Sequence, residues 1–340
     1  MRQLTCTGPN TLEWREVAEP TLHEHGDALV RPIAVARCEI DPILTSGLIP
    51  SQTPFAVGHE SVSEILELGD DTSGMVVGQR VVVAFQVSCG SCRSCDAGHS
   101  GNCDAYPVLS DYGMQPLSQV EYGGMLSDVV RVPHAKAMLQ PIPDGIDPVS
   151  LASVSDNVLD GYRTVAAHLA EQPGADVLVV CHGSRSIALY AAQAALALGA
   201  GRVDFASDDQ DALSLATELG ATPISTDFRR RQERYSIVAD CGMRAEGLRY
   251  SINSTAPEGI CHSASYLPGG EVPLPLGKLY TLGIRFHIGR AHSASLLPEI
   301  MPLIASRKLR PEEITTRVVD WEDAPTAWLE DTIKLVVRRD

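Results

Sequence analysis

Four cysteines stand within fifteen residues of one another and strongly limit how the chain around them can fold. Their spacing is C-x2-C-x2-C-x7-C, which lets one loop fold four thiolates around a tetrahedral ion. Zinc is the natural occupant, although an iron–sulfur cluster, whose usual spacings differ, also accepts four thiolates. Because four protein ligands leave no open coordination position, we expect a structural zinc ion here. The predicted ligands are Cys89, Cys92, Cys95 and Cys103.

Charge and cysteine usage narrow the location and the partners. Nine cysteines are an odd number, and with the cluster they favour metal-bound thiolates in a reduced compartment over a disulfide framework. Residues Met1–Asn10 lack the apolar core of a signal peptide, and no uncharged apolar run reaches the ~18 residues typical of a membrane span. We therefore expect a cytoplasmic protein without a membrane partner. The net charge of -16, from 27 Lys and Arg against 43 Asp and Glu, disfavours nucleic acid as a partner.

Length and pattern predict two domains. The 340 residues exceed the ~250 to 300 residues at which single hydrophobic cores stop growing. The first 150 residues hold short β-type runs separated by Gly, Pro and Asp, which predicts a mostly β domain. The clearest of these runs are Ala28–Ile33, Ser61–Leu66, Arg80–Phe85 and Ser127–Val132.

From Asp176 onward the pattern changes to alternating strands and helices. The apolar strand Val177–Val180 is followed by a short turn with glycine and by the Ala-rich helical stretch Ile187–Leu198. A second strand at Arg202–Ala206 and a helical pattern at Asp211–Leu219 continue the alternation, which is typical of an α/β fold. Later segments are the apolar runs Ser236–Ala239 and Gly259–Ser263, a helical segment Leu296–Ser306 and a final β-like run Ile333–Val337.

A second set of residues carries a resemblance to a known family. The motif Gly58-His59-Glu60 follows Cys38, and the four-cysteine lobe and the strand–turn–helix pattern come after it. With these features the chain resembles the zinc-containing medium-chain alcohol dehydrogenases over nearly its full length. The resemblance implies that Cys38, His59 and Asp156 bind a catalytic zinc ion, with Asp156 standing where many other members have cysteine. It also implies that Glu60 is either a fourth ligand or a nearby carboxylate.

The implied ligands also suit the chemistry. A thiolate, an imidazole and a carboxylate leave one zinc position for water or a substrate oxygen, where the ion acts as a Lewis acid on an alkoxide or a carbonyl. We expect Asp41 to orient His59 through its other ring nitrogen. Each ligand taken alone has a structural alternative: a buried small hydrophobe for Cys38, a core histidine for His59 and a helix cap for Asp156.

One departure from the family concerns the proton. Family members usually carry Ser or Thr two residues after the cysteine ligand, and its hydroxyl passes the substrate proton towards solvent. This chain has Ile40 there, which cannot relay a proton. Beside the transfer of hydride between a nicotinamide cofactor and an alcohol or carbonyl substrate, two alternatives therefore stay open. One is reduction of a C=C or C=N bond with structural zinc only, and the other is a catalytically inactive cofactor-binding protein.

The expected cofactor is NAD or NADP. The family places a Gly-rich turn between the first strand and helix of the cofactor domain, where backbone N–H groups face the pyrophosphate. Here the turn reads G-x-R-x-x-A from Gly183, so we expect Gly183, Ser184, Arg185 and Ser186 to bind the cofactor; a solvent-facing side chain is the alternative for Arg185.

Four further residues bear on the cofactor. Ser207 occupies the place where the family has an acidic residue that binds the adenine ribose, and the missing acid favours NADP. The adjacent carboxylates of Asp208 and Asp209 favour NAD, because they would repel a ribose phosphate. Lys334 stands where the family often has a basic residue near the pyrophosphate; a surface lysine is the alternative.

The sequence thus predicts a mostly β, GroES-like catalytic zinc domain and a doubly wound parallel-sheet (Rossmann) dinucleotide-binding domain. We expect the first to comprise residues 1–155 and 291–340 and the second residues 156–290. The segment Thr281–Gly289 resembles the interface strand of the family, which implies a homodimer or homotetramer. The remaining partner is a small-molecule substrate.

Overall fold

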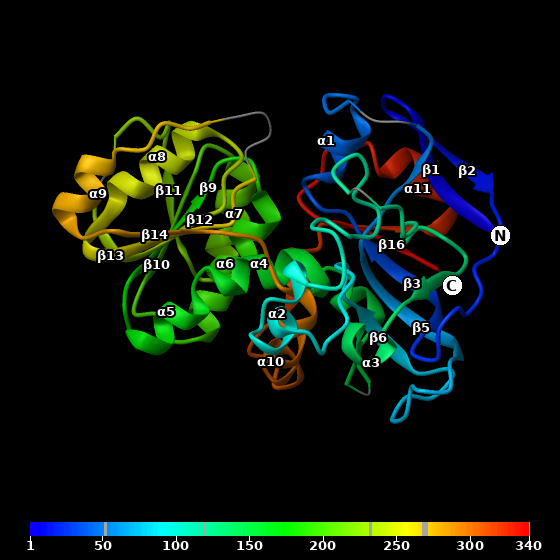
Figure 1. Ribbon diagram of the computed structural model, residues 1–340. Helices are drawn as coiled ribbons and strands as arrows, with labels where there is room; N and C mark the ends of the chain where they lie inside the picture. Colours follow the sequence, from blue (N-terminus) through cyan, green and yellow to red (C-terminus); the bar gives the residue numbers. More distant parts are fainter. Residues whose placement is uncertain (51–52, 119, 144, 231–232, 267–270, 340) are drawn as a thin grey trace. The chain divides into compact units, whose positions relative to one another are not determined.

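The computed structural model describes residues 1–50, 53–118, 120–143, 145–230, 233–266 and 271–339 (Figure 1). The chain forms two compact units. The first unit comprises Met1–Leu159, Ala291–Arg307 and Thr315–Asp340, and the second comprises Asp160–Arg290 and Lys308–Ile314. No helix of the described residues is long and apolar enough to cross a membrane.

The first unit is built on a largely antiparallel sheet with the strand order β15-β16-β3-β5-β6-β8, and β7 also pairs with β3. The long strand β3 is almost entirely buried, and its register with β5 shifts next to Pro32, which has no N–H to donate to the ladder. Strand β16 pairs with β3 so that Val336 lies opposite Ala36, which brings the start of β16 next to Arg37, the residue before Cys38. The strands are β3 (Ala28–Ala36), β5 (Glu60–Leu68), β6 (Arg80–Val83), β7 (Val130–Val132), β8 (Leu139–Pro141), β15 (Arg317–Asp320) and β16 (Leu335–Arg338).

Smaller elements complete the first unit. A second sheet has the order β2-β1-β4, and Asn10 in the hairpin between β1 and β2 has a φ of 51°. The bounds are β1 (Arg2–Gly8), β2 (Thr11–Glu16), β4 (Phe55–Ala56), α1 (Asp41–Thr45), α2 (Arg93–Asp96), α3 (Ala135–Met138), α10 (Ser293–Ala305), α11 (Ala324–Ala327), the 3-10 turns η1 (Ser100–Asn102), η2 (Pro148–Leu151) and η5 (Trp321–Asp323), and the π-helical turn η3 (Val154–Val158).

The second unit is a doubly wound parallel sheet with the strand order β11-β10-β9-β12-β13-β14. This order reverses between β9 and β12, and ligands of such sheets bind at the carboxyl ends of the strands at that point. The bounds are β9 (Val177–Cys181), β10 (Val203–Ser207), β11 (Thr222–Ser225), β12 (Tyr235–Asp240), β13 (Thr255–Ser263), β14 (Arg285–Ile288), α4 (Leu159–Arg163), α5 (Ala166–Glu171), α6 (Arg185–Ala197), α7 (Gln210–Glu218), α8 (Ala245–Ser254), α9 (Leu276–Leu282) and η4 (Pro311–Ile314).

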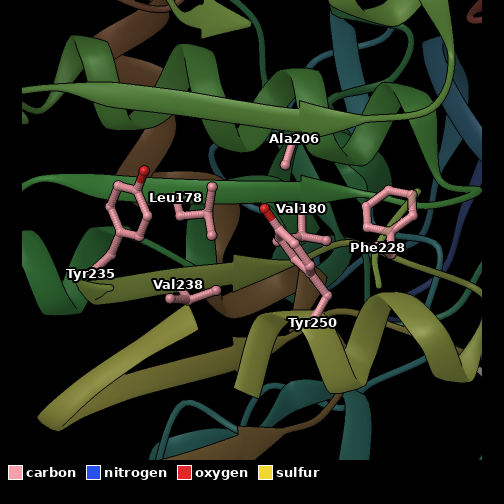
Figure 2. Packing of buried hydrophobic residues seen from close by; sticks show 7 residues of the cluster. All are labelled: Leu178, Val180, Ala206, Phe228, Tyr235, Val238 and Tyr250. Carbon is pink, nitrogen blue, oxygen red and sulfur yellow. The ribbon is translucent and has the colours of Figure 1, made fainter. Parts of the chain in front are cut away.

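The core of the second unit explains why these segments become strands. Figure 2 shows one cluster in which Leu178 and Val180 of β9 lie beside Val238 of the neighbouring strand β12 and pack with Phe228 and Tyr250. Strand β9 is buried at every position, because helices cover both faces of a parallel sheet. Each buried side chain of this size contributes about 1.5–3 kcal/mol to folding. The predicted doubly wound parallel sheet is confirmed.

Candidate metal centre and cofactor turn

Separate elements of the first unit bring four metal-binding side chains together. Cys38 follows β3, His59 precedes β5, Glu60 begins β5, and Asp156 lies on the π-helical turn η3. One ligand atom of each of these residues lies within 4.8 Å of those of the other three. Single π-turns often occur at functional sites, because the extra residue re-aims a side chain. The three predicted zinc ligands and Glu60 are therefore close enough to share one ion.

His59 is held from both sides. Its Nε2 lies 3.2 Å from Oδ2 of Asp156, and its Nδ1 lies 3.4 Å from Oδ1 of Asp41. The other oxygen of Asp41 accepts a hydrogen bond of 2.8 Å from the backbone N–H of Cys38. Asp41 therefore lies against His59 and accepts from Cys38, which is the arrangement we expect of a residue that orients a metal ligand.

The charges of this group fit a divalent cation. Burial, reinforced by the negative charge of Asp156, raises the pKa of the Cys38 thiol far above its usual range. Burial by itself lowers the pKa of His59, but the charge of Asp41 and the hydrogen bond with Asp156 outweigh it and raise that pKa well above its ordinary value. The Cys38 thiol and the His59 imidazole thus keep their protons, because the negative charges of this buried group are not balanced by enough positive charge. A zinc ion supplies that charge, and a thiolate, an imidazole and a carboxylate are its usual protein ligands.

Glu60 is engaged by a buried lysine. Lys334 and Glu60 are both fully buried, and Nζ of Lys334 donates to Oε1 and Oε2 of Glu60 at 3.0 and 2.9 Å. Nζ also donates to the backbone oxygen of Arg37 at 3.0 Å and to Oδ1 of Asn157. Burial raises the pKa of Glu60 to about 8, although the ammonium of Lys334 acts to lower it. Both oxygens of Glu60 are thus occupied by a positive partner.

This geometry corrects the prediction for Lys334. The side chain was expected beside the cofactor pyrophosphate or on the surface. Instead its ammonium has no exposed surface and is surrounded by oxygen acceptors of the first unit, because β16 delivers it next to the start of β5. Long charged side chains are almost never fully buried unless they are paired, and Glu60 is the partner here.

The second group of ligands is the four-cysteine lobe. Sulfur atoms of Cys89, Cys92, Cys95 and Cys103 all lie within 4.8 Å of one another, and all nine cysteines of the chain are free of disulfides. Backbone N–H groups of Cys95 and Asp104 donate to Sγ of Cys92 at 3.5 and 3.3 Å and lower its pKa to about 6. Such N–H donors stabilise a thiolate, which is the form that binds metal. The lobe therefore fits a closed, structural zinc site.

The predicted cofactor turn lies between β9 and α6 in the second unit. Gly183 has a φ of 121°, and a Cβ at this position would meet Cβ of Met243 at 3.1 Å. Ser184 is the N-cap residue of α6, and its side chain accepts no hydrogen bond from the helix. The hydroxyl of Ser184 therefore does not cap the N–H groups of the first turn of α6. A helix N-terminus that binds an anion needs such uncapped N–H groups. Ser186 is buried in the first turn of α6.

Charged groups surround this turn. Nη1 of Arg185 lies 3.4 Å from Oδ2 of Asp209, and the backbone N–H of Asp209 donates to Oγ of Ser207 at 3.1 Å. The side chain of Asp208 is 48% exposed. A cavity of about 900 Å³ opens beside these groups, and it is lined by His182, Asp208, Phe228, Arg229, Arg244 and Arg249 among others.

Comparison with known proteins agrees with this geometry. Residues 24–144 match the alcohol dehydrogenase GroES-like domain. The medium chain reductase/dehydrogenase ucsI of Acremonium sp is 30% identical over 229 residues, which cover 66% of this chain and 75% of that relative. The chain belongs to the zinc-type medium-chain alcohol dehydrogenase family. The predicted GroES-like fold of the first unit and the prediction of an NAD(P)-dependent oxidoreductase are thereby confirmed.

Two further relatives match over nearly the whole chain. The zinc-type alcohol dehydrogenase-like protein C1198.01 of Schizosaccharomyces pombe is 25% identical over 372 residues, covering 96% of this chain and 87% of that protein. The solved structure of the alcohol dehydrogenase TADH from Thermus sp. ATN1 has a TM-score of 0.91 and 25% identity, and the match covers 100% of both chains.

The sequence did not reveal one contact of the metal centre, which Asn157 makes with Cys38. Nδ2 of Asn157 lies 3.1 Å from Sγ of Cys38, while Oδ1 of the same amide accepts from Lys334. The amide therefore points its donor at the sulfur and its acceptor at the ammonium. Its position directly after Asp156 was visible in the sequence, but the side chain it contacts is far away along the chain.

Proposed function

We propose that the protein transfers a hydride between a nicotinamide cofactor and a small alcohol or carbonyl substrate, with a catalytic zinc ion held by Cys38, His59 and Asp156. The observation that carries the proposal is the convergence of these three side chains while Lys334 engages both oxygens of Glu60. Three ligands leave a position for the substrate oxygen, whereas four would close the site. In this assignment Glu60 is a nearby carboxylate rather than a fourth ligand.

In the oxidative direction a secondary or primary alcohol loses its hydroxyl proton and transfers the hydride of its carbinol carbon to NAD⁺ or NADP⁺, which gives a carbonyl compound and NADH or NADPH. Zinc supplies Lewis acidity towards the substrate oxygen when it is bound. Within the chain, Asp41 orients His59, and the Asn157 amide donates to the sulfur of Cys38. These contacts hold the ligands in one geometry before substrate arrives.

We assign the catalytic zinc site to the first unit and the dinucleotide to the turn of the second unit. Gly183, Ser184 and Ser186 would face the pyrophosphate, because a helix N-terminus stabilises an anion. Arg185, Ser207 and Asp208 would lie near the adenosine half, where their charges decide between NAD and NADP. Homodimer or homotetramer formation through the segment Thr281–Gly289 remains part of the proposal; β14, at one edge of the sheet, lies within it.

A second candidate function follows from Ile40. This side chain is buried, two residues after Cys38, and replaces the hydroxyl that carries the substrate proton in the family. Reduction of a polarised C=C bond, which needs no proton to leave a zinc-bound alcohol, would tolerate the isoleucine. The same zinc ligands could then position a carbonyl conjugated with that bond.

Metal analysis and a turnover screen test the proposal together. We expect two zinc ions per chain in the purified protein, and one in the Asp156→Ala variant with its four-cysteine lobe intact. Alcohols, aldehydes and unsaturated carbonyls are then assayed with NAD(H) and NADP(H). Alcohol or aldehyde turnover that Asp156→Ala abolishes supports the first function, and turnover of unsaturated carbonyls alone supports the second. A single zinc ion in the unaltered protein, unaffected by Asp156→Ala, would contradict both readings of the Cys38 site.

A further inference from the structure

A buried carboxylate at the end of β12 has no assigned role. Asp240 is 0% exposed and accepts hydrogen bonds from three serine hydroxyls, which with it we call the Asp240 cage. Oδ2 accepts from Oγ of Ser263 at 2.6 Å and from Oγ of Ser265 at 2.7 Å, and Oδ1 accepts from Oγ of Ser251 at 3.0 Å. Burial raises the pKa of Asp240, while these hydroxyls act to lower it. A buried carboxylate is costly, so one that three hydroxyls hold in place points to a positional role.

The cage is connected to the cofactor turn. Oγ of Ser265 accepts a hydrogen bond of 3.0 Å from the backbone N–H of Gly242 while it donates to Asp240. Gly242 forms a β-bridge with Gly183, and the next N–H, of Met243, donates to the backbone oxygen of His182 at 2.9 Å. Two hydrogen bonds therefore link the carboxylate to Gly242, and the β-bridge and the hydrogen bond of the adjacent Met243 join this segment to Gly183 and His182 of the turn.

The Asp240 cage also contacts α8, a helix that lines part of the cavity beside the turn. Ser251 belongs to α8, and Gly247 of the same helix lies so close to His182 that a Cβ would meet Cβ of His182 at 2.8 Å. Arg244 at the N-cap of α8 and Arg249 on the helix line the cavity of about 900 Å³ together with His182. One carboxylate thus ties α8 and the turn to the end of the sheet.

We propose that Asp240 is a positioning residue for the dinucleotide, which fixes the Gly183 turn through Ser265 and Gly242 and fixes α8 through Ser251. This inference rests on the proposed function, because it assumes that NAD(H) or NADP(H) binds at that turn. Replacing a residue with this role changes the affinity for the cofactor and leaves zinc binding in the first unit unchanged.

The test compares Ser265→Ala and Asp240→Ala with Thr164→Val. Thr164 is also fully buried, and its Oγ1 donates to the backbone oxygen of Gly161 at 2.6 Å, but it is not part of the cage. The Kd values of NADH and NADPH are measured by fluorescence, with zinc content as a control. We expect both cage variants to weaken the preferred cofactor about tenfold, the loss of roughly one well-placed hydrogen bond, and Thr164→Val to change Kd less than about twofold. The double variant Ser265→Ala/Asp240→Ala should weaken binding less than the product of the two single effects, because both lie on one path.

Hydrogen exchange gives a readout that needs no cofactor. In Ser265→Ala we expect faster exchange at residues 241–243 and 182–184, and unchanged exchange there in Thr164→Val. Unchanged exchange in Ser265→Ala, or a Kd within about twofold of the unaltered protein, overturns the inference. If the unaltered protein binds neither dinucleotide, the proposed function itself fails and the inference falls with it.

Discussion

Replacing Lys334 with methionine is the most direct perturbation of the metal centre that leaves every proposed ligand in place. The ammonium has no exposed surface and donates to both oxygens of Glu60, to the backbone of Arg37 and to Asn157. Methionine has a similar length and no charge. It leaves the carboxylate of Glu60 buried without its partner, and it removes the donor that orients the Asn157 amide.

The expected loss follows from the burial of the pair. Removing one partner of a buried ion pair costs ~3–5 kcal/mol, because the other charge stays buried and uncompensated. Removing the ammonium raises the pKa of Glu60 further, so that a neutral carboxyl group limits the loss to the lower end of that range. We therefore expect Lys334→Met to lower the free energy of unfolding of the first unit by ~3 kcal/mol.

Urea denaturation followed by tryptophan fluorescence measures this loss in the right part of the molecule. The three tryptophans, Trp14, Trp321 and Trp328, all belong to the first unit, so their signal reports its unfolding and not that of the second unit. The second unit contributes no tryptophan signal that would blur the transition.

A double variant supplies the control. Glu60→Gln combined with Lys334→Met removes both charges, and replacing a whole buried pair is often close to neutral. We expect the double variant to recover most of the stability that Lys334→Met loses. A loss below ~1 kcal/mol in Lys334→Met, or a double variant whose loss equals the sum of the two single losses, would refute the reasoning that the pair is a coupled, buried unit.

Three further outcomes are expected. Cys95→Ser should lower the zinc content by one ion per chain and destabilise the first unit, which metal analysis and the tryptophan signal measure; a zinc content equal to that of the unaltered protein would contradict it. Gly183→Ala should weaken cofactor binding and cost ~1–3 kcal/mol, because alanine is strained at a φ of 121°; an unchanged Kd for NADH and NADPH argues against the turn. Burial and the charge of Arg163 lower the pKa of His262 to about 2. As the pH falls below ~6.5, the imidazole of His262 is therefore protonated in the unfolded chain but not in the folded one. The free energy of unfolding of the second unit then falls by up to ~1.4 kcal/mol per pH unit. Hydrogen exchange of β13 between pH 7 and pH 5 measures that loss, and His262→Gln should reduce it.

Much of the fold could be read from periodicity. The buried strand predicted over Val177–Val180 is β9, and the Ala-rich helix predicted over Ile187–Leu198 is α6. Both signals are local, because a buried parallel strand is apolar at every position and a helix against it is rich in small residues. Strand β11 was missed, since its residues Thr222–Ser225 are mostly exposed and show no apolar pattern.

Within the metal centre, the ligands could be predicted and their supports could not. His59 stands in a motif that follows Cys38, so a resemblance was enough to single out both residues. The resemblance placed Lys334 near the cofactor pyrophosphate, and its neighbours along the chain give no sign that it is buried against Glu60. The same holds for Asn157, whose contact with Cys38 spans most of the first unit in sequence. Pairing between distant segments is a property of the packed fold and leaves no local pattern.

Charge balance connects these supports to the identity of the ligands. With Cys38 as a thiolate and Asp156 and Glu60 as carboxylates, the protein places three negative charges in one buried group. A zinc ion would balance two of them and the ammonium of Lys334 balances the third, while the buried carboxylate of Asp41 beside His59 adds one more negative charge. A buried net charge is strongly unfavourable, which explains why a lysine is buried here at all. Exchanging Asp156 for the cysteine of many relatives leaves the sum unchanged, because both bring one negative charge. Exchanging Lys334 for a neutral residue removes one positive charge from that sum, unless Glu60 is replaced by a neutral residue as well.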